Sequence, residues 1–74
     1  RTIFRESITS IARAQNIVVL KTMPGLASAA CSALDNMDIA YMVGTLAGDD
    51  TVMIVMRNTE SAAAFVAEIK EMLR

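Results

Sequence analysis

The 74 residues of this chain suffice for one small domain, and a domain of this size buries only about 60% of the surface that its unfolded chain exposes. The formal net charge is −1 and the seven Lys and Arg residues are spread along the chain, which argues against nucleic-acid binding by this segment alone, because such binding needs a basic face. With no His and one Cys, the chain lacks the commonest general base and cannot assemble a zinc site from one copy. We therefore expect a single domain over residues 1–74 that is not an enzyme and has no metal or cofactor.

The composition is more apolar than a small monomer needs, since 54% of the residues are hydrophobic, 20% are charged and the mean hydropathy is +0.44. We interpret the excess as an interface. Cys31 cannot form an internal disulfide, which favours a cytoplasmic location and a packing role over a reactive thiol. No run approaches the roughly 18 apolar residues of a membrane span. Because the chain starts at Arg1 rather than Met, we expect it to be a piece of a longer protein.

Two structures compete for the first fifteen residues. Phe4, Ile8 and Ile11 have the spacing of a helix, whereas residues 7–13 also fit the first arm of a β-hairpin, which we favour. The second arm is clearer, because residues 17–22 form a β-branched run and predict a strand.

A helix is predicted from Pro24, a residue that suits the first helical turn. Its apolar stripe consists of Leu26, Ala30, Ala33, Leu34 and Met37. Ser28, Ser32 and Asp35 share another face because they are four and three residues apart. Asp35 falls in the last turn, where the helix dipole disfavours a carboxylate by roughly a few tenths of a kcal/mol. It either meets a ligand or faces solvent at the helix end, and the residues alone favour solvent.

A second hairpin is predicted from residues 41–46 and 51–57, which flank a turn at residues 47–50. Each of residues 52–56 is apolar, so both faces of that strand should be buried, although a two-layer domain covers a sheet on one face only. We expect a second copy of the domain to cover the other face through closed symmetry.

The last helix is predicted to begin at a cap formed by Asn58 or Thr59. Its inner face is expected to consist of Ala62, Phe65, Val66, Ile69, Met72 and Leu73. The elements together predict an α/β (α+β) fold: a two-layer ββαββα sandwich with a four-stranded sheet and two helices on one face.

The most informative residues are Asp49 and Asp50, two adjacent carboxylates between Gly48 and the last strand. Two neighbouring anions repel each other by about 1 kcal/mol in water, so a cation would relieve them, and a planar guanidinium with five donors suits two carboxylates well. The alternative is an ordinary turn that faces water, and the pair by itself favours this alternative.

Three stretches of the chain resemble the C-terminal domain of bacterial arginine repressors. They are residues 15–22, the Pro24-Gly25 helix start with Ala33-Leu34-Asp35, and residues 44–51. The last stretch, Gly-Thr-Leu-Ala-Gly-Asp-Asp-Thr, is the most specific. The resemblance covers most of the chain in the family's order.

The resemblance implies a domain that forms trimers, two of which stack into a hexamer with L-arginine bound between them. Asp49 and Asp50 would lie at that boundary, with Asp49 contacting the guanidinium of an arginine held by the facing trimer. Asp35 would meet the α-amino end of the ligand, and Thr45 and Ala47 would offer backbone groups. DNA would be bound only through an N-terminal domain that this chain lacks. The implied role is effector sensing in a transcription regulator of arginine metabolism.

Ser28 departs from the family pattern, because many members have Gln at this position, four residues after the Pro. Its side chain is shorter and lacks the amide donor, although a water molecule could bridge the gap. L-Arginine remains the expected ligand, with citrulline or no ligand as alternatives. Citrulline lacks the charge that paired carboxylates require.

Three other functions compete with arginine sensing. A constitutive oligomerisation module would have a fixed size and no small-molecule ligand. An enzyme with this element order would resemble the pterin carbinolamine dehydratases, whose chemistry depends on histidines that this chain lacks. A sensor of another amino acid would be stabilised by a ligand such as lysine instead.

Overall fold

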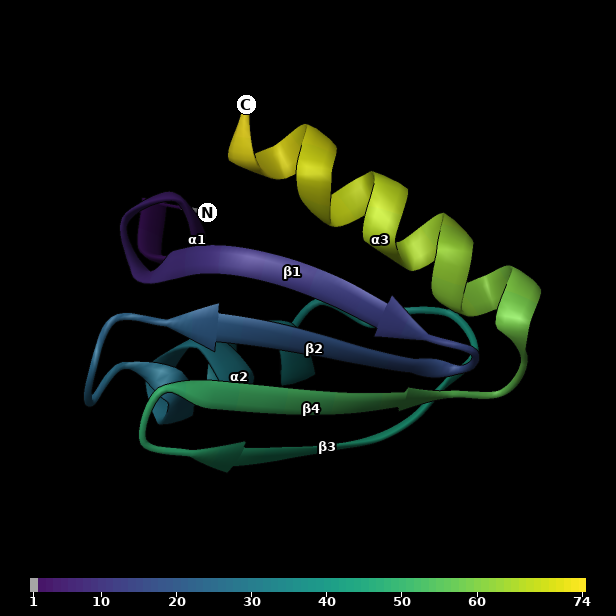
Figure 1. The fold of residues 1–74 in the computed structure, drawn as a ribbon, viewed down its shortest axis with the longest axis horizontal. Coiled ribbons are helices and arrows are strands. Elements are labelled where there is room, and N and C mark those ends of the chain that lie inside the picture. Colours follow the sequence, from purple (N-terminus) through teal and green to yellow (C-terminus); the bar gives the residue numbers. More distant parts are fainter. Residues whose placement is uncertain (1) are drawn as a thin grey trace.

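The chain folds around a four-stranded antiparallel sheet (Figure 1). The strands are β1 (Ile8–Ala14), β2 (Ile17–Thr22), β3 (Met42–Gly48) and β4 (Thr51–Met56), in the spatial order β1-β2-β4-β3. The helices are α1 (Thr2–Ser7), α2 (Ala27–Asp35) and α3 (Thr59–Leu73). The computed structural model describes residues 2–74, with side chains from residue 4 onward.

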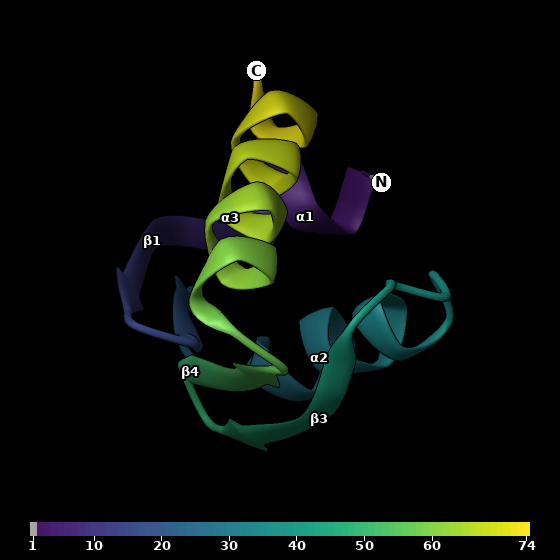
Figure 2. The ribbon, with the colours of Figure 1, turned by 90° about the vertical axis from the view of Figure 1, so that its right-hand side faces the viewer.

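The helices of the described chain lie on one face of the sheet (Figure 2). There, α2 lies over the edge formed by β3, while α3 lies over the side that includes β1. The two-layer sandwich, the α+β class and the ββαββα order are therefore confirmed. The strand predicted over residues 17–22 has these bounds in the structure.

The core lies between the sheet and the helices, because alternate residues of a strand point to opposite faces. β2 buries Val18 and Leu20 on the inner face, and β4 buries Val52, Ile54 and Met56. The helices close this core with Phe4, Ala27, Ala30, Leu34, Ala62, Phe65 and Ile69. The inner face is thus completed within one chain.

The opposite, outer face of the sheet is also apolar. Residues opposite each other in an antiparallel pair share a face, and Val19, Met53 and Leu46 form such a row across β2, β4 and β3. Met53 is 43% exposed and Leu46 is 72% exposed. We expected both faces of β4 to be buried, and within one chain only the inner face is. That a second copy covers the outer face stays a prediction.

The short helix α1 was not predicted. The hairpin arm that we favoured, residues 7–13, corresponds to β1, which begins one residue later at Ile8. The alternative, a helix, is present only up to Ser7. A six-residue helix is too short to be stable alone, so it depends on tertiary contacts. Its Phe4 side chain is only 1% exposed, and α1 contacts both α2 and α3. Local spacing could not reveal this packing.

Both ends predicted for the central helix need correction. Pro24 and Gly25 form a turn, and α2 begins at Ala27. Gly25 has φ +82°, a left-handed conformation that interrupts helical geometry before the chain enters α2. At the other end α2 stops at Asp35, so Met37 lies beyond the helix and is 38% exposed rather than part of an inner stripe.

The start of α3 is confirmed as a cap at Asn58. The Ser61 backbone N–H donates to Asn58 Oδ1 at 2.8 Å, and the Asn58 backbone N–H donates to Ser61 Oγ at 3.3 Å, which is a reciprocal capping box. Of the predicted inner face, Ala62, Phe65 and Ile69 are buried, and the other three residues are partly buried against the core.

Candidate functional site

The two candidate carboxylates lie on a two-residue turn. β3 extends to Gly48, so the turn consists of Asp49 and Asp50 rather than the predicted residues 47–50. Asp49 has φ 45°, a left-handed conformation that Asp tolerates better than most residues. The turn is anchored by its backbone, because the Asp49 carbonyl accepts from the Ala27 N–H at 3.0 Å and the Asp50 carbonyl accepts from the Thr22 N–H at 2.7 Å. These bonds fix the turn to the start of α2 and the end of β2.

The carboxylate of Asp50 already has a cation. Lys21 Nζ lies 3.6 Å from Asp50 Oδ1 and donates to Thr51 Oγ1 at 2.8 Å, while the Thr51 hydroxyl donates to Asp50 Oδ1 at 2.9 Å. The Thr51 hydrogen bond, followed by the charge of Lys21, holds the pKa of Asp50 below its ordinary value. Sequence reasoning missed Lys21. Only the register of β2 against β4, which sets Lys21 opposite Thr51, places it there.

Asp49 differs sharply from its neighbour. Its side chain is exposed, and among the side chains described, those of residues 4–74, none donates a hydrogen bond to its carboxylate or forms an ion pair with it. The predicted need for a cation therefore applies to one member of the pair. Asp49 is a free acceptor on an anchored turn, next to a carboxylate that is paired with Lys21.

Asp35 and Thr45 are brought into direct contact. The Thr45 hydroxyl donates to Asp35 Oδ1 at 3.0 Å, and the Cys31 thiol donates to the Thr45 oxygen at 3.2 Å. The Thr45 bond offsets the unfavourable position of Asp35 at the negative end of α2. Thr45 thus contributes its hydroxyl, not only the backbone groups expected of it. Cys31 is half-buried, and its link to Thr45 was not predicted.

Five of the six predicted residues lie along the border between α2 and β3, which we call the α2–β3 strip: Ser28, Asp35, Thr45, Ala47 and Asp49. Thr45 and Ala47 lie opposite the inward-facing Ile54 and Val52, so they are on the helix side of the sheet. Within residues 2–74, the side chain of Ser28 is exposed and makes no hydrogen bond to the other five. The contacts of the Asp50 carboxylate are with Lys21 and Thr51, which are not among these five residues.

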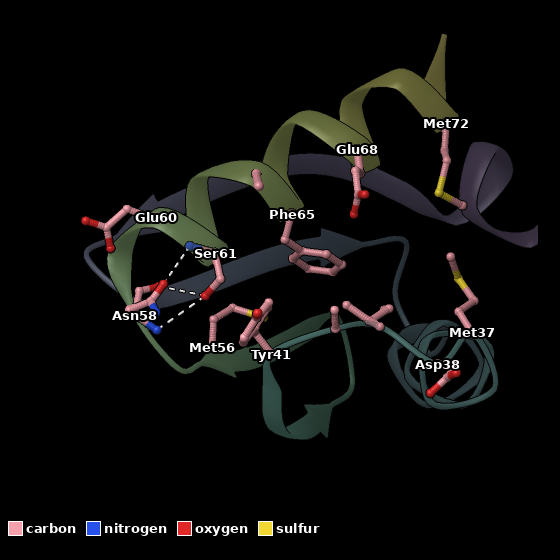
Figure 3. Close-up of a pocket in the computed structure, with 13 residues that line it drawn as sticks. Met37, Asp38, Tyr41, Met56, Asn58, Glu60, Ser61, Phe65, Glu68 and Met72 are labelled. Carbon is pink, nitrogen blue, oxygen red and sulfur yellow. Dashed lines mark hydrogen bonds between the residues drawn. The ribbon is translucent and has the colours of Figure 1, made fainter.

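A separate groove lies between α3 and the segment that joins α2 to β3 (Figure 3). Its volume is about 940 Å³, with Phe65 and Met56 at its floor and the carboxylates of Asp38, Glu60 and Glu68 around it. In the part of the chain that the structure describes, none of the six predicted residues lines this groove. Four residues of the α2–β3 strip, Ser28, Asp35, Ala47 and Asp49, are exposed, so a small ligand on the strip would need a second wall to exclude water.

Over residues 2–74, no group of three or more His, Cys, Asp or Glu side chains is arranged to hold a metal ion. Among the described helices, none has the length and apolar character needed to cross a membrane.

Comparison with known proteins gives one family. The model for the C-terminal domain of the arginine repressor matches residues 4–71. The chain is similar to the arginine repressor of Acetivibrio thermocellus, with 47% identity over 73 residues that cover 99% of this chain and 48% of that protein. It is 44% identical over 72 residues to the arginine repressor of Alkaliphilus metalliredigens, covering 97% and 46%, and 43% identical over 70 residues to that of Thermotoga maritima, covering 95% and 46%.

The chain thus spans about half the length of the curated relatives it matches. These relatives are named as repressors rather than as enzymes, which agrees with the expectation of a non-catalytic domain.

Proposed function

The chain belongs to the family of arginine repressor C-terminal domains, and we propose that it is the L-arginine-sensing and oligomerisation domain of a transcriptional regulator of arginine metabolism. In this proposal L-arginine binds between two trimers and stabilises the hexamer. The observation that carries the proposal is the free carboxylate of Asp49, fixed on an anchored turn beside Asp50, which is paired with Lys21.

Each end of the ligand has a complementary group in this proposal. The guanidinium meets Asp49, whose carboxylate can accept two parallel N–H bonds. The α-amino group meets Asp35, which the Thr45 hydroxyl already orients through one oxygen. Backbone groups of Thr45 and Ala47 contact the remainder, and Ser28 acts through a bridging water where its shorter side chain does not reach.

The open strip explains why such a site would lie between copies. An ion pair in water stabilises by only about 0–1 kcal/mol, so Asp49 alone would hold a guanidinium weakly. A facing trimer would exclude water and close the strip. A ligand that requires both trimers binds the hexamer better than separate trimers, and it stabilises the hexamer by that difference in affinity.

The outer face of the sheet supports self-association. Leu46 and Met53 are exposed large apolar side chains in one cross-strand row. Monomeric proteins rarely leave a large apolar patch in water. We propose that neighbouring copies within a trimer cover this face, and that six such domains would present DNA-binding domains absent from this chain to operators by avidity.

A constitutive oligomerisation module is the second candidate. Lys21 already pairs with Asp50, and Ser28 has a short side chain without an amide donor, so the domain could assemble copies without binding a small molecule. Such a module would keep one size whether or not an amino acid is present.

Sedimentation velocity separates the two candidates. The domain is compared at low micromolar concentration with no addition, with millimolar L-arginine and with millimolar L-citrulline. A shift from trimer to hexamer with arginine alone supports the proposed sensor. An unchanged sedimentation coefficient, together with no heat of binding when the same sample is titrated with arginine, supports the constitutive module. A response to lysine in the same series would instead indicate a different amino acid as the effector.

A further inference from the structure

Lys21 is the cation at the acidic turn, and the proposed function does not use it. Its ammonium lies 3.6 Å from Asp50 Oδ1 and donates to Thr51 Oγ1, and the same hydroxyl donates to Asp50. Lys21, Thr51 and Asp50 therefore contact one another pairwise, and Lys21 of β2 lies opposite Thr51 of β4. The two side chains of the ion pair are 47% and 45% exposed, so water and other cations can reach them.

The turn does not need this ion pair to keep its shape. Its backbone is anchored by the bonds from Ala27 and Thr22, and neither bond involves the ammonium group. The ion pair instead changes the charge of the turn. Asp49 and Asp50 would carry a charge of −2 alone, and the ammonium reduces this to −1, which equals in size the single charge of one guanidinium.

We propose that Lys21 is an internal competitor for the ligand: its ammonium pairs with Oδ1 of Asp50, so that the turn offers one unpaired carboxylate and an incoming guanidinium must compete with the charge of Lys21 to engage the second. This inference rests on the proposed arginine-sensing function and adds a regulating residue to the same site. The lowered pKa of Asp50 agrees with it, because an Asp50 that stays ionised keeps its hold on the ammonium.

The competition lowers affinity and improves selectivity. A cationic ligand at Asp50 either breaks the contact between Lys21 and Oδ1 or binds at Oδ2 beside the like charge of the ammonium, so the net gain is smaller than for two free carboxylates. A turn of charge −1 also attracts divalent cations less than a turn of charge −2 does. Lys21 would thus set the arginine concentration at which the domain responds.

The test is calorimetric titration of L-arginine into the wild-type domain and three variants. Lys21→Met removes the ammonium and keeps the apolar stem, and we expect its Kd to fall about two- to fivefold, as breaking an exposed ion pair requires. Lys21→Arg retains the charge and should stay within about twofold of wild type. Lys70→Met is the matched control, because Lys70 is the only other lysine and lies exposed near the end of α3.

Two further readouts separate competition from a general loss of structure. In an Asp50→Asn background the Lys21→Met substitution should no longer change the Kd, because there is no charged partner to release. Carbon-detected NMR titration should show a higher pKa for Asp50 in Lys21→Met than in wild type, since the second cause of the lowered pKa is gone.

The outcomes distinguish this inference from the function on which it rests. A Kd for Lys21→Met that equals or exceeds the wild-type value, or an unchanged pKa of Asp50, overturns the role of Lys21 and leaves arginine sensing intact. If titration with L-arginine gives heat of binding for Lys21→Met but none for wild type, Lys21 competes strongly enough to prevent detectable binding, and the inference is supported. If neither protein gives heat when it is titrated with L-arginine, the proposed function itself is overturned.

Discussion

The two faces of the sheet are built from the same strands and are similarly apolar, yet only one is closed in the folded chain. On β4, Ile54 is fully buried under the helices, while the adjacent Met53 on the opposite face is 43% exposed. The difference arises from where the helices lie, not from the hydrophobicity of the strand (Figure 2). The inner face therefore determines the stability of one chain, and the outer face is available for assembly.

Replacing Ile54 by Ala should give the largest effect on folding. The side chain is fully buried, so its truncation leaves a cavity, and we expect the free energy of unfolding to fall by about 2–5 kcal/mol. A domain of this size has little stability to spare. Urea denaturation at one fixed, low protein concentration measures the change.

Met53→Ala is the matched control on the outer face of the same strand. It should change the free energy of unfolding by less than about 1 kcal/mol under the same conditions, because much of the side chain is already in water. Equal losses for the two variants would show that the two faces are equally buried in solution.

Leu46→Lys tests the outer face as an interface. A lysine at this position would be buried without a partner if another copy covers the face, so we expect self-association to weaken about 30-fold or more. The circular dichroism spectrum should be unchanged, because Leu46 is 72% exposed in one chain. Sedimentation equilibrium measures the association. Wild-type assembly in this variant would remove the outer face from the interface.

Asp49→Asn tests the turn at the end of these strands. It keeps the shape and the left-handed backbone, which Asn also tolerates, but removes the charge. We expect L-arginine to bind about tenfold more weakly, as the loss of a charged hydrogen-bond partner requires, with the trimer intact. Calorimetry and sedimentation velocity on the same sample measure the two properties.

Asp38→Asn is the control for that substitution. Asp38 also has a positive φ, 54°, and it lies at the groove beside α3 rather than on the α2–β3 strip. Its replacement should leave arginine binding unchanged. If both variants lose binding equally, the effect comes from net charge and not from the turn.

The strands and the order of the elements along the chain were predictable because local pattern determines them. The run over residues 17–22 and the paired runs around the acidic turn fit strands by composition alone, and Asn58 fits a helix cap by its side chain. The helix α1 was not predictable, because Phe4 owes its burial to two helices distant in sequence. The start at Pro24 was wrong because Gly25 takes a left-handed conformation that composition does not reveal.

For the candidate site, the sequence identified the acidic residues but not their partners. Asp35 and Asp50 both acquire hydrogen bonds from hydroxyl groups, and Asp50 also acquires a lysine, through strand register and helix placement. The inequality of Asp49 and Asp50 therefore emerges only in three dimensions. The roles of these residues in binding arginine stay predictions.

The smallest expected effect is a pH dependence of the free energy of unfolding, which arises from the contacts of Asp50. The pKa of Asp50 is below its ordinary value in the folded chain, first because of Thr51 and then because of Lys21. A depressed pKa stabilises the fold above the unfolded value of about 3.9, and that contribution is lost as the pH falls through the folded pKa. The stability advantage of wild type over Asp50→Asn should therefore shrink between about pH 5 and pH 3. Urea denaturation across this range measures it.

In Lys21→Met the pH dependence should persist in part, because the Thr51 hydrogen bond remains. Its complete loss in that variant would assign the stabilisation to the ammonium instead.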